Sequence, residues 1–127
     1  MRKELEQYFD RLWPLCRSLT GNGVRDTFKI LQEVIPLQLT EVPSGKKVFD
    51  WTVPDEWNLE DAYLITPDGR KTASLKENNL HLMGYSIPIQ KTMEWEELVS
   101  HLHTRPDLPD AIPYMTSYYK RDWGFCL

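Results

Sequence analysis

An apolar stripe with the spacing of an α-helix opens the chain. It covers residues 5–19, where apolar side chains recur at steps of three and four, and a second stripe of the same period covers residues 24–34. Pro14 interrupts the first stripe, so we expect a kink or a new short helix there, because proline lacks the N–H that a helix interior needs. Pro36 ends the second stripe. The pattern predicts a helical hairpin whose apolar faces turn inward.

The middle of the chain changes to the period of a β-strand. Alternating, β-branched and aromatic residues predict strands at 37–42, 47–53, 61–66, 71–75 and within 80–89. The sequence Pro-Asp-Gly-Arg at 67–70 has proline and glycine at the positions that a tight turn requires, so it should close a hairpin. This part of the chain is therefore predicted to be mostly β.

The C-terminal third combines a helix, a proline-rich stretch and aromatic strands. An apolar stripe predicts a helix at about 94–103, and three prolines within 106–113 predict an extended course. Residues 114–127 have the composition of strands. Because the last residues are apolar, we expect an element that awaits a partner from sequence that is absent; a short last strand docked on the sheet is the alternative.

Composition and charge fit one folded domain, or one domain plus a piece of another. The chain has 127 residues, 41% of them hydrophobic, and a net charge of −4 with the signs interspersed. This distribution offers no basic face to nucleic acid and no charged block to an anionic membrane. The N-terminus lacks the apolar segment of a secretory signal, and Cys16 and Cys126 show no framework spacing. We therefore expect a cytoplasmic protein without nucleic-acid or membrane partners.

Local signatures of catalysis and metal binding are missing. His101 and His103 lie two apart on the predicted helix, so their side chains diverge, and His81 has no further ligand at zinc-site spacing. Cys16 and Cys126 fall in apolar runs, which favours small buried side chains over nucleophiles. The sequence predicts no catalytic residue, no metal ligand set and no cofactor within this chain.

The polar elbow between the two predicted helices is the remaining candidate site. Glycines flank its centre, and the backbone N–H groups of the second helix begin there, so an anion or a substrate carboxylate could bind. The candidate residues are Arg17, Ser18, Thr20, Asn22 and Arg25. In the structural alternative, Thr20 or Asn22 caps the second helix, and the arginines pair with acids such as Asp26 or Glu33.

Several long motifs carry a resemblance to a known family. They are Pro-Leu-Cys-Arg-Ser-Leu-Thr-Gly-Asn-Gly-Val-Arg at 14–25, Glu-Val-Pro-Ser-Gly-Lys-Lys-Val-Phe-Asp-Trp-Thr-Val-Pro-Asp-Glu-Trp at 41–57, Glu-Asn-Asn-Leu-His-Leu-Met-Gly-Tyr-Ser at 77–86, Pro-Asp-Ala-Ile-Pro-Tyr-Met-Thr-Ser-Tyr-Tyr at 109–119 and Trp-Gly-Phe-Cys at 123–126. These motifs resemble the N-terminal part of the bacterial aminopeptidase-like family. Its members are domain-of-unknown-function proteins similar to zinc aminopeptidases, and they are often encoded near polysaccharide-biosynthesis genes.

The resemblance implies an α+β chain that forms part of a larger fold. Residues 1–40 would belong to an incomplete α/β aminopeptidase-like core with two helices and a strand. Residues 41–113 would form a small β-rich inserted domain with the helix at about 94–103, and residues 114–127 a strand segment that returns toward the core. The family's zinc-binding His, Asp and Glu motifs lie beyond Trp-Gly-Phe-Cys, so zinc, and the water it activates for amide hydrolysis, is expected only in a full-length homologue.

Together, these observations predict an N-terminal fragment of an aminopeptidase-like zinc hydrolase that is not catalytically competent alone. Its expected partners are the missing C-terminal part of the same fold or a peptide-like substrate. The alternative is a stand-alone β-rich module that binds a glycan or a protein through Trp51, Trp57 and Tyr63. Such a module would need solvent-exposed aromatic rings.

Overall fold

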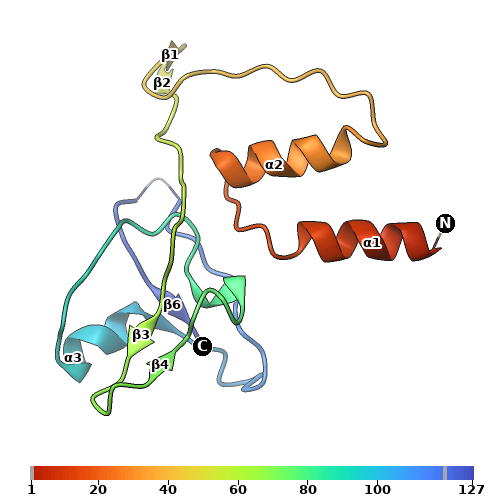
Figure 1. Cartoon of the computed structure of the whole chain (residues 1–127). Coiled ribbons are helices and arrows are strands. Elements are labelled where there is room, and N and C mark those ends of the chain that lie inside the picture. Colours follow the sequence, from red (N-terminus) through yellow and green to blue (C-terminus); the bar gives the residue numbers. More distant parts are fainter. Residues whose placement is uncertain (1, 119) are drawn as a thin grey trace. The chain divides into compact units, whose positions relative to one another are not determined.

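The computed structural model describes residues 2–118 and 120–127, which form two compact units (Figure 1). Unit 1 is Met1–Asn58 and unit 2 is Leu59–Leu127. The division of the sequence at residues 40 and 113 stays a prediction; its last segment, 114–127, falls within unit 2, with Tyr119 outside the described residues. In the described ranges, no helix has both the length and the apolar character needed to cross a membrane.

Unit 1 begins with the predicted helical hairpin. Helix α1 (Arg2–Leu12) ends before Pro14, so the proline ends the helix and does not kink it, and α2 (Asn22–Leu31) runs back beside α1 (Figure 1). Arg11 binds both carboxylate oxygens of Glu33, at 2.7 and 2.5 Å, and this ion pair joins α1 to the turn that follows α2. Neither helix contains a buried residue. The prediction of inward apolar faces is therefore wrong for side chains such as that of Phe9, which is exposed.

A small hairpin follows where the sequence predicted one continuous strand. Strands β1 (Lys47–Val48) and β2 (Trp51–Thr52) pair antiparallel, because the chain reverses at Phe49 and Asp50. The predicted strand at 37–42 is also absent from the described structure of this segment. Its alternating pattern meets no neighbouring strand, and a strand without a partner has no ladder to join.

Unit 2 contains the hairpin that the turn signal predicted. Strands β3 (Leu64–Ile65) and β4 (Lys71–Thr72) pair antiparallel, and Gly69 takes φ 83° in the turn between them. Thr66 N–H donates to the carbonyl of Arg70, which closes the loop at 3.0 Å. This hairpin is confirmed.

The centre of unit 2 is the last strand, β6 (Phe125–Cys126). It pairs parallel with β5 (Leu102–His103) on one side and forms an antiparallel bridge to Leu82 on the other. Leu82 follows a short 3-10 helix, η1 (Asn79–His81), so residues 80–89 form isolated bridges and not the predicted strands. The C-terminal segment is thus an interior strand of an irregular, mixed sheet.

The predicted helix at 94–103 is shorter than expected. Helix α3 (Trp95–Leu98) passes into a 3-10 turn, η2 (Val99–His101), and the chain then extends into β5. The reason is that β6 pairs with Leu102 and His103, so tertiary pairing overrides their helical spacing. Residues 105–111 form consecutive turns, with Leu108 N–H donating to the carbonyl of Arg105 and Ala111 N–H to that of Leu108, which corrects the predicted extended course over most of 106–113.

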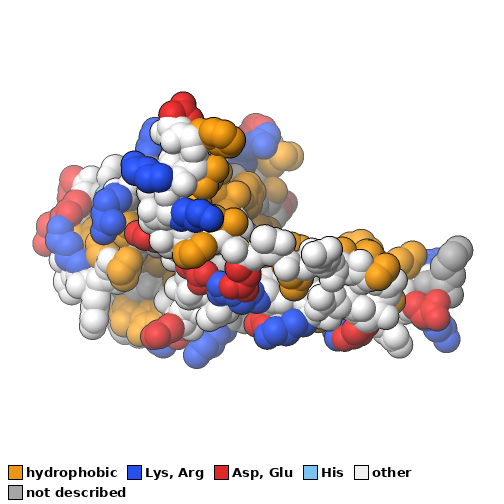
Figure 2. Space-filling view, turned by 90° about the horizontal axis from the view of Figure 1, so that it is seen from above, with side chains coloured by type: hydrophobic (Ala, Val, Ile, Leu, Met, Phe, Trp, Pro, Cys, Tyr) orange, Lys and Arg blue, Asp and Glu red, His pale blue; other side chains and the backbone are white. Residues whose placement is uncertain are grey.

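All buried hydrophobic residues of the described chain lie in unit 2. They are Ala73, Met83, Trp123, Phe125 and Cys126. Half-buried side chains from β3, α3 and β5 pack around them. The described residues of unit 1 form no such core, and Figure 2 shows hydrophobic side chains reaching the molecular surface at many places. The fold is α+β, with its core in unit 2.

Replacing Trp123 should unfold unit 2 at lower denaturant. We expect Trp123→Ala to lower the free energy of unfolding by about 3–5 kcal/mol, because it removes a buried indole from the core. Trp95→Ala is the matched control, since Trp95 is 62% exposed, and should change it by less than about 0.5 kcal/mol. Urea titration followed by circular dichroism measures both. If both substitutions lower the free energy of unfolding equally, Trp123 is not part of the core.

Candidate functional site

The elbow between α1 and α2 is built by close contact between backbone segments. Gly21 precedes α2 with φ 128°, and a Cβ added there would lie 2.3 Å from the carbonyl oxygen of Trp57. A Cβ at Gly23 would lie 2.2 Å from the carbonyl oxygen of Cys16. Neither position has room for a side chain. Gly21 also has a positive φ, which favours glycine, whereas Gly23 is needed only for the close approach of the backbone.

A remote asparagine caps helix α2. The backbone N–H of Asn22 donates to Asn58 Oδ1 at 2.7 Å, and Trp57 N–H donates to the carbonyl of Thr20 at 3.2 Å. The end of unit 1 thus returns to the elbow. The predicted caps by Thr20 or Asn22 are wrong, because Gly21 is the N-cap residue and makes no side-chain cap. No local pattern could have revealed a cap supplied from 36 residues away.

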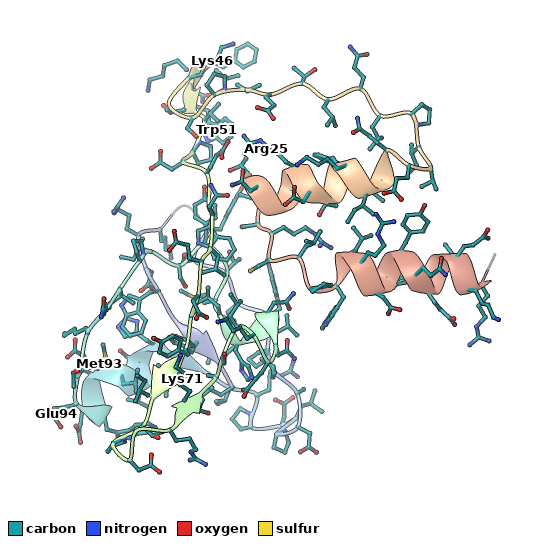
Figure 3. All side chains as sticks on the ribbon, in the orientation of Figure 1. Arg25, Lys46, Trp51, Lys71, Met93 and Glu94 are labelled. Atoms are coloured by element: carbon teal, nitrogen blue, oxygen red, sulfur yellow. The ribbon has the colours of Figure 1, made fainter. Side chains whose placement is uncertain are left out.

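Arg25 connects three parts of unit 1 at the start of α2 (Figure 3). Its Nε donates to Glu41 at 2.9 Å, its Nη1 donates to Asn22 Oδ1 at 3.1 Å and to Glu56 at 2.9 Å, and its Nη2 binds the second oxygen of Glu56. The hydrogen bonds from Glu56 and then Glu41 raise the pKa of Arg25 above its usual range. The same contact with Arg25 lowers the pKa of Glu56. This cluster fastens both ends of the segment 41–56 to the helix.

Arginine–acid pairs form as predicted, but with other acids than those expected for Arg17 and Arg25. Asp26 pairs with Lys29, and Glu33 pairs with Arg11, whereas Arg25 pairs with Glu41 and Glu56. Each pair joins a basic side chain to an acidic one. Sequence distance alone favoured the nearer acids, and the fold of the intervening chain selected the others.

The remaining elbow residues do not join the Arg25 cluster. Arg17 Nη1 donates to the carbonyl of Leu12 at 2.8 Å, so it satisfies the last residue of α1, where a positive charge is favourable. Ser18 is half-buried. Thr20 Oγ1 is buried and makes no hydrogen bond within the described residues. The structure thus brings Asn22 and Arg25 together, and anion binding by the five residues stays a prediction.

Two of the three histidines bind carbonyl groups of the C-terminal segment, and the third, His103, lies on β5. His81 Nδ1 lies 2.8 Å from the carbonyl oxygen of Cys126, and His101 Nδ1 lies 2.9 Å from that of Trp123, so each Nδ1 donates to a carbonyl. The His101 ring also stacks on the Trp123 ring, with centroids 3.8 Å apart. Among residues 2–118 and 120–127, no three His, Cys, Asp or Glu side chains are placed to hold a metal ion.

Both cysteines have protonated, protected thiols. Burial raises the pKa of Cys126, and burial also raises that of Cys16, although the adjacent Arg17 charge opposes the shift. Cys126, on β6, is fully buried, and Cys16 is half-buried. Neither thiol has the low pKa and access that a nucleophile needs. The prediction that they act as buried apolar side chains is confirmed for Cys126.

Both units of this chain are similar to the same known proteins. The family described as a domain of unknown function (DUF2172) matches residues 56–127. A Clostridium acetobutylicum protein, provisionally named as a polysaccharide biosynthesis protein with an aminopeptidase-like domain, is 56% identical over 124 residues, which are 98% of this chain and 29% of that protein. A crystal structure from the same organism, provisionally named as a peptidase, has a TM-score of 0.91 at 55% identity and covers 98% of this chain and 30% of that one. This chain therefore spans less than a third of these relatives, and in the first it corresponds to the N-terminal part.

The Arg25–Glu56 pair should make unit 1 sensitive to acid. Because the pKa of Glu56 is lowered from 4.5 in the folded chain, its contribution to stability is present above that value and is lost as pH falls through the lower, folded pKa. Glu56→Gln should therefore show a smaller loss of helical circular dichroism between about pH 6 and about pH 3 than the unaltered chain. Glu96→Gln, at an exposed position on α3, is the control. If Glu56→Gln and the unaltered chain lose helical circular dichroism equally as the pH falls, the Arg25–Glu56 pair does not stabilise unit 1.

Proposed function

The chain belongs to the DUF2172 family, and from this premise we propose that it forms the N-terminal part of an aminopeptidase-like hydrolase. The observation that carries the proposal is the high identity that runs through both units to a relative with an aminopeptidase-like domain. A solved relative provisionally named as a peptidase has nearly the same backbone over this region. In this proposal, the reaction is hydrolysis of a peptide-like amide by the longer protein.

The hydrolytic centre is proposed to lie outside this chain. The described residues do not fit a catalytic zinc site, which takes about three protein ligands around an open position. Zinc and its ligands are therefore assigned to the part of the longer relatives that follows the matched region. The proposed partner of this chain is that same C-terminal part, and the proposed setting is polysaccharide biosynthesis, as the relative's name suggests.

The elbow is proposed as one wall of the substrate site. Arg17 is exposed, and in the described hydrogen bonds its guanidinium uses only Nη1, so it has donors for a substrate carboxylate. Arg25 differs, because two carboxylates and an amide oxygen already occupy its donors. Of the two arginines, Arg17 is therefore the better candidate for binding an anion, and Arg25 supports the elbow.

Activity and metal content should separate this chain from its longer relative. We expect the full-length C. acetobutylicum protein to bind zinc and to release amino acids from peptide-like amides, whereas this chain alone does neither, because it lacks a ligand set in the described residues. Metal analysis and an aminoacyl-amide assay on both proteins measure this. Stoichiometric zinc with hydrolysis by the short chain would contradict the incomplete site. A full-length protein that hydrolyses no such amide would contradict the reaction class.

The binding-module alternative has one observation in its favour. Trp51 is 46% exposed, as a stacking platform requires. Tyr63 is less suited, because Lys71 Nζ lies 3.6 Å from the centroid of its ring and covers one face. Trp51 and Tyr63 also belong to different units. Acrylamide quenching of tryptophan fluorescence tests this alternative. If added sugars reduce the quenching, the binding module is favoured over the N-terminal part of a hydrolase.

A further inference from the structure

The tip of the β1–β2 hairpin holds an aromatic residue in a strained arrangement. Val48 pairs with Trp51, so Phe49 and Asp50 form a two-residue loop. Phe49 has φ 56°, at the first loop position, where hairpins favour glycine, asparagine or aspartate. A bulky residue is strained in this conformation. The Phe49 side chain is 99% exposed, so packing within the described chain does not offset the strain.

Two other non-glycine residues with positive φ show how the strain is ordinarily supported. Ala73, with φ 49°, is buried in the core of unit 2. Tyr85, with φ 68°, is half-buried, and its ring meets that of Tyr118 edge to face at 6.3 Å. Phe49 has no comparable support. An outlier that the surrounding chain does not enforce points to a contact made outside it.

The remainder of unit 1 also lacks apolar cover. No hydrophobic side chain described in this unit is buried, and large exposed ones occur on both helices, on the segment after them and on the hairpin. Besides Phe49, the most exposed are Leu5 and Phe9 on α1, Trp13 just after it and Val34 just after α2. Apolar surface on this scale is typical of a face that another protein segment covers. In Figure 3, the labels Lys46 and Trp51 mark the hairpin at the far end of the extended segments of unit 1.

We propose that Phe49 is an anchor that docks the β1–β2 hairpin into an apolar pocket of the aminopeptidase-like region that follows in the longer relatives. This inference rests on the proposed function. We choose this region as the docking partner because of chain length. The relatives align with almost all of this chain, the hairpin included, and most of their sequence lies outside the match. An exposed aromatic side chain on a protruding turn is the kind of residue that dominates binding energy once a pocket encloses it.

A grafted protein tests this proposal. The N-terminal part of the full-length C. acetobutylicum relative is replaced by this chain, with Phe49 or with Phe49→Gly, and the isolated chain carries the same change. Glycine removes the anchor and also relieves the strain. We expect Phe49→Gly to lower the melting temperature of the graft by at least about 3 °C and to leave the isolated chain as stable as before or slightly more stable. Trp95→Ala, at a residue that is 62% exposed on α3 in unit 2, is the control and should change neither.

The outcomes separate docking from hydrolysis and from self-association. A graft whose melting temperature is unchanged by Phe49→Gly would overturn the docking proposal, whether or not it hydrolyses amides. A lowered melting temperature without any hydrolysis in the unaltered graft would support docking and count against the proposed function. If sedimentation shows that the isolated chain is a dimer and that Phe49→Gly dissociates it, the partner of Phe49 is a second copy of the chain, and the proposed docking on the aminopeptidase-like region is overturned. If the graft does not fold, glycine at the aligned position of the native relative must lower its melting temperature by the same amount.

Discussion

Burial of one strand organises the stable part of this protein. Phe125 and Cys126 both pair with β5, Phe125 also bridges to Leu82 on its other side, and two histidines donate hydrogen bonds to the carbonyls of Trp123 and Cys126. Because the strand is interior, its backbone groups are satisfied and its side chains form the core that β3, α3 and β5 cover. The family match begins just before unit 2, in accord with a unit that has its own core.

Unit 1 is held together in a different way. Its helices and its hairpin are joined by Arg11–Glu33, by the Arg25 cluster and by the Asn58 cap, which are polar contacts at least partly open to water. Such contacts select a geometry, but individually they stabilise it little. No apolar side chain among its described residues is buried, and our proposal is that the aminopeptidase-like region of the longer relatives covers this surface. Such cover would account for the exposed apolar side chains of the helices and for the strained, exposed Phe49, and it agrees with the resemblance to longer proteins.

The sequence predicted those features that depend on neighbouring residues. Helical spacing identified α1 and α2, and the Pro-Asp-Gly turn identified the β3–β4 hairpin, because each is fixed within a short window. It failed where distant segments decide the outcome. Pairing with β6 ended the predicted helix early, and Asn58 and Glu56 reached the elbow from far along the chain. At the candidate site, the sequence identified Arg25 but could not identify the acids that occupy it.

Among the described residues, unit 2 has a core of its own and unit 1 lacks one. Hydrogen exchange of the isolated chain, read by mass spectrometry, tests it most directly, because protection reports the local free energy of opening. Peptides that contain β5 and β6 should be strongly protected, whereas peptides from α1, α2 and the β1–β2 hairpin should exchange far faster. Equal protection of the two units would contradict the account.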